Sequence, residues 1–286
     1  MATEPSPPPP HTPTVIGAAA SAADPRSPRP ARSAPLTAPL AVAEILIVLS
    51  LSLGRSAVYA VVHLVAAATA PGGLAGQRAV LNGSLAPGRP WLDLVLQLMS
   101  LAFSVAPVAL AGYLLIRSGD SLRLTWFGGD RVLVARDLLR GAGLAAGVGA
   151  LGIAFYLVTH ALGLDLTVVA AALPDIWWSI PVLVLSALAN AVNEEFVVLG
   201  FVLVRLRQLG LREPVAIGAA ALLRGSYHLY QGFGGFLGNL AMGVLFGWLY
   251  RRWGRLTPLV LTHTLLDVGA FVGYGVLAGH VSWLPT

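Results

Sequence analysis

The sequence has 286 residues, of which 56% are apolar and 11% are charged, and its formal net charge is +5. Soluble domains carry about 25% charged residues, so this composition excludes an ordinary soluble protein and indicates a membrane protein. There is no cysteine, which excludes disulfides, thiolate metal sites and a cysteine nucleophile. All basic residues other than histidine are arginines, which collect beside membrane spans, so the positive charge does not indicate a nucleic-acid partner.

The chain begins with a segment, residues 1–36, that is rich in proline, serine and alanine. Such a segment cannot bury enough apolar surface to offset the entropy lost on ordering, so we predict a disordered tail. Apolar runs follow, and a helix that crosses a bilayer needs about 20 residues. We place seven spans, or eight if the fourth is broken near Pro181, at 41–68, 91–116, 138–163, 177–206, 214–231, 236–250 and 257–279.

The predicted fold class is all-α, a polytopic bundle of transmembrane helices, because lipid offers no partners for backbone N–H and C=O groups. We divide the chain into the tail, N-terminal transmembrane helices at 37–176 and a helical core at 177–280. Arginines are concentrated in the tail, between the second and third spans, and after the fourth and sixth spans. By the positive-inside rule these parts face the cytoplasm. We therefore predict an integral plasma-membrane protein with a cytoplasmic N-terminus.

Two ionisable residues lie in the first predicted span. Glu44 and Arg55 are eleven residues apart, which corresponds to three turns on one face of a helix. We interpret them as packing or pairing residues.

Ionisable side chains also lie inside three of the later spans, where they are costly and usually functional. They are Glu194 and Glu195 in the fourth span, Arg224 and His228 in the fifth, and His263 and Asp267 in the seventh. The last two pairs are spaced four apart, so each pair shares a helix face. A self-neutralising acid pair and packed core histidines are the structural alternatives. Convergence of acids, bases and donors in a dry cavity is the arrangement of proton-transfer chemistry.

These residues can act in two ways. A carboxylate beside a histidine can activate water, and a neighbouring donor can hold a developing oxyanion. Alternatively, two histidines and a carboxylate can hold zinc, for which Glu194, His228 and His263 are the candidate ligands.

The order of these motifs resembles the CPBP family of intramembrane metalloproteases, which process CAAX proteins and bacteriocins. The family pattern is EExxxR, then FxxxH, then HxxxN or HxxxD. In this sequence the corresponding stretches are EEFVVL from Glu194, RGSYH ending at His228, and HTLLD from His263 to Asp267. The resemblance covers residues 187–270.

The resemblance implies an endopeptidase that hydrolyses a peptide bond of a membrane-associated peptide or protein. Glu194 would act as general base on a water, helped by His228, while His263 and Asp267 stabilise the tetrahedral intermediate and Glu195 supports them. Zinc is the cofactor that the family name implies, but a metal-free glutamate mechanism is equally open.

The sequence departs from the family pattern at two positions: Leu199 replaces the arginine of EExxxR, and Arg224 replaces the phenylalanine of FxxxH. We expect Arg224 to pair with Glu195 in place of the missing arginine. Two alternatives remain open. One is an inactive family member that serves as a membrane scaffold or immunity-type partner, and the other is a proton-coupled transporter.

Overall fold

The computed structural model describes residues 36–120, 131–277 and 280. The tail predicted at 1–36 lies outside these residues, except for Leu36. The first elements are α1 (Ala38–Ser50), α2 (Leu53–Thr69), the 3-10 turn η1 (Leu74–Gly76), β1 (Arg78–Val80), α3 (Pro90–Arg117), α4 (Arg131–Ala161) and β2 (Thr167–Val169). They are followed by α5 (Ser179–Glu194), the π-helix η3 (Glu195–Leu203), α6 (Val204–Gln208), α7 (Glu213–Tyr227), the 3-10 turn η4 (Leu229–Gln231), α8 (Phe233–Trp253) and α9 (Thr257–Leu277). The predicted helical class is confirmed.

The described residues provide fewer membrane spans than the sequence predicted. Five helical segments are long and apolar enough to cross a membrane: α3, α4, the continuous run from α5 through α6, α8 and α9. Helices α1 and α2 pass the same test only as a pair, which is bent by 56°. Helix α7 has 15 residues. At about 1.5 Å per residue it is shorter than the ~30 Å hydrocarbon core. The count of seven or eight is therefore not confirmed; five spans are found, or six with the bent pair.

The predicted break near Pro181 does not occur, because Pro181 lies in the first turn of α5, where a missing N–H group is tolerated. The irregular part of this span comes later, where the chain continues from α5 as a nine-residue π-helix. Every residue of η3 is buried, and most of them belong to the largest apolar cluster. π-Helices are rare in proteins but are frequent at functional sites, so a π-helix that begins at a pair of adjacent glutamates indicates a candidate functional site.

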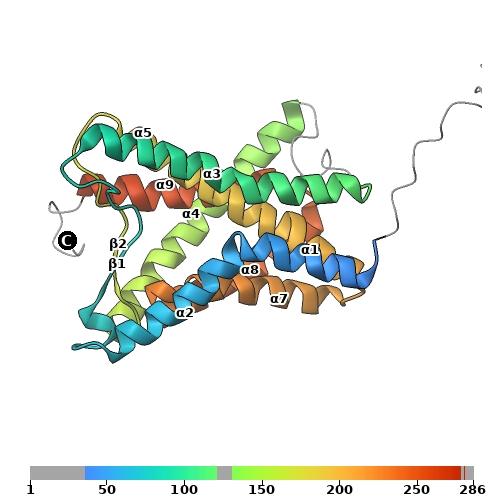
Figure 1. Ribbon diagram of the computed structural model, residues 1–286, viewed down its shortest axis with the longest axis horizontal. Coiled ribbons are helices and arrows are strands. Elements are labelled where there is room, and N and C mark those ends of the chain that lie inside the picture. Colours follow the sequence, from blue (N-terminus) through green and yellow to red (C-terminus); the bar gives the residue numbers. More distant parts are fainter. Residues whose placement is uncertain (1–35, 121–130, 278–279, 281–286) are drawn as a thin grey trace, which may run out of the picture. The chain divides into compact units, whose positions relative to one another are not determined.

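Helices α7 and α8 lie side by side (Figure 1), and glycines of α8 allow their backbones to approach. A Cβ atom at Gly243 would lie 2.9 Å from the Cα of Ala221, and one at Gly247 would lie 3.0 Å from Cγ2 of Ile217. Small residues at such contacts are how membrane helices reach close packing. Helix α9 packs against both α4 and α5, and η3 packs against α7. Side chains from α5, η3, α7 and α9 can therefore meet in one interior region.

A short parallel sheet joins two connections of the chain. Strand β1 pairs with β2, with Arg78 opposite Thr167, so the segment after α2 is held beside the segment after α4. Just before β2, the buried side chain of Asp165 accepts hydrogen bonds from the backbone N–H groups of Gly234 and Gly235, at 2.7 and 3.2 Å. These groups belong to the first turn of α8, which leaves its donors unpaired, so Asp165 fixes where α8 begins.

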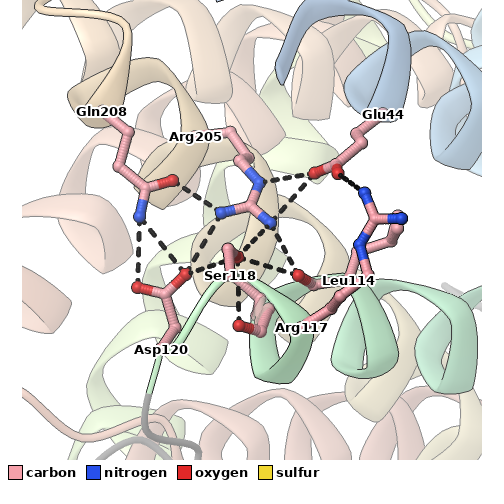
Figure 2. Close-up of polar contacts among 8 residues, drawn as sticks. Glu44, Leu114, Arg117, Ser118, Asp120, Arg205 and Gln208 are labelled. Carbon is pink, nitrogen blue, oxygen red and sulfur yellow. Dashed lines mark hydrogen bonds and ion pairs between the residues drawn. The ribbon is translucent and has the colours of Figure 1, made fainter. Parts of the chain in front are cut away.

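A buried ion cluster joins α1 and the end of α3 to α6 (Figure 2). Arg205 on α6 is fully buried, and its guanidinium lies 3.0 Å from Glu44 and 3.1 Å from Asp120. It also donates hydrogen bonds to the Leu114 carbonyl oxygen at 3.0 Å and to the Ser118 hydroxyl at 2.8 Å. A buried charge persists only when it is paired and hydrogen-bonded, and Arg205 meets both conditions.

The interpretation of Glu44 as a pairing residue is confirmed, but Arg55 is not its partner. Helix α1 ends at Ser50, and the bend before α2 places the two residues on different helices, so the expected common face does not exist. Glu44 instead binds Arg205 and, through its other carboxylate oxygen, Arg117 at 3.1 Å. Among the residues that the structure describes, Arg55 has no ion pair.

We predict that Glu44→Gln lowers the free energy of unfolding by ~3–5 kcal/mol, because it leaves the buried Arg205 guanidinium short of negative charge. Thermal or denaturant unfolding of the purified protein in detergent measures the change. Glu213→Gln is the control, since the Arg251–Glu213 pair is exposed, with side chains 39% and 43% accessible, and exposed pairs contribute about 0–1 kcal/mol. Equal losses in the two variants would contradict the prediction.

Candidate active site

The structure brings all the predicted site residues into one connected group. Glu194 ends α5 and Glu195 begins η3, so the two carboxylates leave the same helical run at the point where its geometry changes. Arg224 lies in the last turn of α7, and His228 follows the end of that helix. His263 and Asp267 lie one turn apart on α9. Contacts among these side chains connect the elements.

Glu195, like Arg224, is fully buried within the group. Its Oε1 atom accepts hydrogen bonds from Arg224 Nη1 at 2.7 Å and from His263 Nδ1 at 2.8 Å. Its other oxygen is buried and has no hydrogen-bond partner among the described residues. Because Oε1 binds Arg224 of α7 and His263 of α9, Glu195 links these two helices.

Arg224 supplies the positive charge at this centre, and the pairing with Glu195 that the sequence led us to expect is present. Its guanidinium is fully buried, and Nη2 lies 3.5 Å from Glu194 Oε2 and 3.2 Å from His263 Nδ1. The guanidinium carbon also lies 5.4 Å from the ring centre of Phe246, within the range of a cation–π contact. Leu199, which takes the place of the family arginine, is 1% exposed and packs in the apolar cluster around η3.

Glu194 differs from its neighbour because it is reachable from outside the group. Its side chain is 14% accessible, whereas that of Glu195 is 0% accessible. The Tyr227 hydroxyl donates a hydrogen bond to Glu194 Oε2 at 2.8 Å, which holds the carboxylate in place. Tyr227 was not predicted from the sequence. A signal existed, because Tyr227 lies three residues after Arg224 and so shares its helix face.

His228 has a defined tautomer. Its Nδ1 atom lies 3.0 Å from the Arg224 carbonyl oxygen, which can only accept a hydrogen bond, so Nδ1 carries the hydrogen. In a neutral ring Nε2 is then an acceptor. The ring is flanked by Tyr227, with ring centres 4.7 Å apart, and by Tyr230, at 6.3 Å. Contacts with these two aromatic rings and the hydrogen bond at Nδ1 restrict the orientation of the imidazole.

His263 is held at both ring nitrogens. Nδ1 faces the Glu195 carboxylate, and Nε2 lies 3.6 Å from Asp267 Oδ1, too far for a direct hydrogen bond but close enough for attraction when the ring is charged. The Asp267 side chain is 20% accessible and also interacts with Asn190, one turn before Glu194 on α5. Asp267 therefore lies at the more open side of the group, next to Glu194.

The candidate zinc ligands do not converge in an arrangement that fits a metal ion. Within residues 36–120, 131–277 and 280, no three side chains of histidine, aspartate or glutamate are placed to share one. The positively charged Arg224 guanidinium lies between Glu194 and His263, two of the proposed ligands. A cation in that position would repel a metal ion, whereas it balances the two carboxylates.

The apolar spans and the buried acid–arginine–histidine group define an integral membrane protein with a candidate site for proton-transfer chemistry. Residues 176–269 match the family of Rce1-like type II CAAX prenyl endopeptidases. The resemblance to CAAX-processing proteases is thereby confirmed for this segment, which contains every residue of the candidate site. Searches of curated proteins and of solved structures give no significant match.

We predict strong coupling between Glu195 and Arg224, because removal of either charge leaves the other buried without its nearest partner. Glu195→Gln and Arg224→Gln should each lower the free energy of unfolding by ~3–5 kcal/mol. The double variant should lose less than the sum by about 1–3 kcal/mol. Unfolding of the four proteins in one detergent completes this cycle. A parallel cycle on the exposed Arg251–Glu213 pair is the control. Losses that simply add at Glu195 and Arg224 would rule out the coupling.

Proposed function

We propose that this protein is an intramembrane endopeptidase that hydrolyses a peptide bond in a membrane-associated peptide or protein. The observation that carries the proposal is the different environment of the two adjacent carboxylates. Glu195 is sealed and paired with Arg224 and His263, while Glu194 is partly accessible and held by Tyr227. A carboxylate that is fixed in direction and reachable by water is what a general base requires. The matched endopeptidase family supports the same reaction.

In the proposed reaction, Glu194 takes a proton from a water molecule as that water adds to the peptide carbonyl carbon. The Nε2 atom of His228 accepts a hydrogen bond from the same water and so orients it. When His263 is doubly protonated, Glu195 holds its Nδ1–H, and its Nε2–H can donate to the developing oxyanion. Asp267 favours that charged ring from 3.6 Å. Glu194 then returns its proton to the leaving amine.

The proposed mechanism contains no metal step. Arg224 already balances the negative charge of the two glutamates, and His263 Nδ1 is committed to Glu195. In the proposed mechanism, the donor groups around the carbonyl oxygen polarise the substrate carbonyl, which a metal ion would otherwise do.

The two alternatives carried from the sequence are less well supported. The inactive-scaffold alternative is based on Leu199, which replaces the family arginine. Arg224, however, provides a guanidinium to Glu195 from the neighbouring helix. A proton-coupled transporter needs a polar path through several spans. In the described parts of α3 and α4, the buried acids are committed locally: Asp93 accepts from the Leu85 backbone at 2.9 Å, and Asp137 pairs with Arg255.

The arginine distribution supports a cytoplasmic N-terminus, and we propose that substrates reach the site from within the bilayer or from its surface. Their peptide nature follows from the proposed reaction. We propose no nucleic-acid partner, because the arginine excess is accounted for by membrane topology.

We predict that Glu194→Gln lowers peptidase activity by at least about a hundredfold, since general-base catalysis contributes ~10²–10⁴-fold. His228→Ala should also be strongly impaired, because the water loses its orienting acceptor. Purified proteins in liposomes, assayed against a set of membrane-anchored fluorogenic peptides, provide the measurement. Glu213→Gln, an exposed acid on the surface of α7, is the control with unchanged activity. Equal cleavage by wild type and both site variants would remove the enzyme assignment.

Chelation tests the metal-free mechanism. We predict that incubation with EDTA or 1,10-phenanthroline leaves kcat/KM within about twofold, because no proposed step uses a metal, whereas removing a catalytic metal would cost several kcal/mol of transition-state stabilisation. Elemental analysis of the same preparation shows whether zinc copurifies. Loss of activity on chelation that zinc restores would establish metal dependence and reject this mechanism.

A further inference from the structure

A large pocket adjoins the candidate active site on the side of α2. Its volume is about 780 Å³, and it is lined by α2, β1 and the chain around the end of α7. The charged, histidine and tyrosine side chains of the lining are Arg55, Tyr59, His63, Arg78, Tyr227 and Tyr230. Pockets of about 300–1,000 Å³ are the usual size of small-ligand sites, so a short peptide segment fits here.

The pocket is positively charged. Two arginines line it, Arg55 from α2 and Arg78 from β1, and its lining includes no aspartate or glutamate. Neither arginine has an ion pair among the residues that the structure describes. Both side chains are exposed, so their guanidinium groups are accessible to a ligand. The pocket therefore presents two accessible guanidinium groups that no acidic side chain of the described residues holds.

The pocket and the candidate active site share Tyr227. Its ring lines the pocket, and its hydroxyl holds Glu194 at 2.8 Å. Tyr230, also in the lining, lies against His228, and its hydroxyl oxygen accepts a hydrogen bond from the Gln231 amide at 3.0 Å, so its own hydrogen remains available to a ligand. Because Tyr227 belongs to both, the pocket is the neighbouring space on the Tyr227 side of Glu194.

We propose that this basic pocket, lined by Arg55 and Arg78, binds a carboxylate of the substrate on the side of the scissile bond nearest Tyr227. Guanidinium groups form charge-assisted, often bidentate hydrogen bonds with carboxylates, which gives both affinity and direction. The carboxylate is that of an acidic side chain or of the chain end. This inference rests on the proposed function, because it names the kind of peptide that the peptidase selects.

The test measures binding without cleavage. Glu194→Gln protein in a zwitterionic detergent is titrated with fluorescent peptides of one apolar sequence, which end in a carboxylate or an amide and carry an internal Glu or Gln. A carboxylate in the pocket should improve the dissociation constant by about tenfold, or ~1.4 kcal/mol. Peptides that differ only at the chain end are compared with peptides that differ only at the internal Glu or Gln. The comparison identifies which carboxylate the pocket binds.

Substitutions locate the effect. Arg55→Gln and Arg78→Gln should each bring the ratio of affinities for carboxylate and neutral peptides toward one, and Arg55→Lys with Arg78→Lys should restore part of the ratio. Arg89→Gln is the matched control, because Arg89 is an exposed arginine outside the pocket and the ratio should not change. Equal affinity for all the peptides in the unsubstituted pocket would overturn the proposal.

Two further outcomes separate the possible errors. If anionic phosphatidylglycerol binds through Arg55 and Arg78 while the peptides show no carboxylate preference, the pocket is a lipid site and the proposal is wrong. If the preference is present and depends on the arginines, but wild-type protein cleaves none of the peptides, the pocket inference holds and the proposed peptidase function fails.

Discussion

The centre of this protein depends on one buried charge, the Arg224 guanidinium. A guanidinium removed from water is tolerated only with negative charge and hydrogen bonds around it, and here Glu195 lies 2.7 Å away and Glu194 3.5 Å away. This requirement brings α7 against the start of η3. The facing helix α8 has no room for a side chain at this point, because a Cβ atom at Gly243 would lie 3.2 Å from Cδ of Arg224. The glycine, the glutamates and the arginine therefore form one structural unit.

The same charge makes two adjacent glutamates different. Glu195 is fixed between Arg224 and His263 and is closed to water, so its negative charge serves the architecture. Glu194 has only the longer contact with Arg224 and a hydrogen bond from a tyrosine. Neighbouring residues on a helix point about 100° apart, so one can face the interior while the other faces an opening. A site that uses one acid for charge balance and the next for chemistry needs both, side by side.

The sequence predicted the candidate site better than it predicted the fold around it. Spacings of four residues on one helix face, and the family motifs, identified a set of candidate residues. Of these, Glu194, Glu195, Arg224, His263 and Asp267 are joined by ion pairs, and His228 contacts the Arg224 backbone and the Tyr227 ring. Tyr227 was missed because its spacing from Arg224 indicates a shared helix face but not that its hydroxyl reaches a carboxylate on another helix. The predicted span count is not confirmed because α7 ends at Tyr227 and is too short for the span that was placed there, which hydropathy does not reveal. The pairing of Arg205 with Glu44, distant in the sequence, likewise depends on how the helices pack.

Arg205 and Arg224, which are both buried, lie near opposite ends of the π-helix. Arg224 pairs with Glu195, its first residue, and Arg205 lies just after its last residue, Leu203. After Glu195, η3 is entirely apolar, and apolar contacts alone do not distinguish one register from another in a bundle where lipid is equally apolar. A shift of the segment by one residue would separate both ion pairs at once. Charge pairing at both ends therefore determines the rotation and depth of this span, and with them the direction in which Glu194 points.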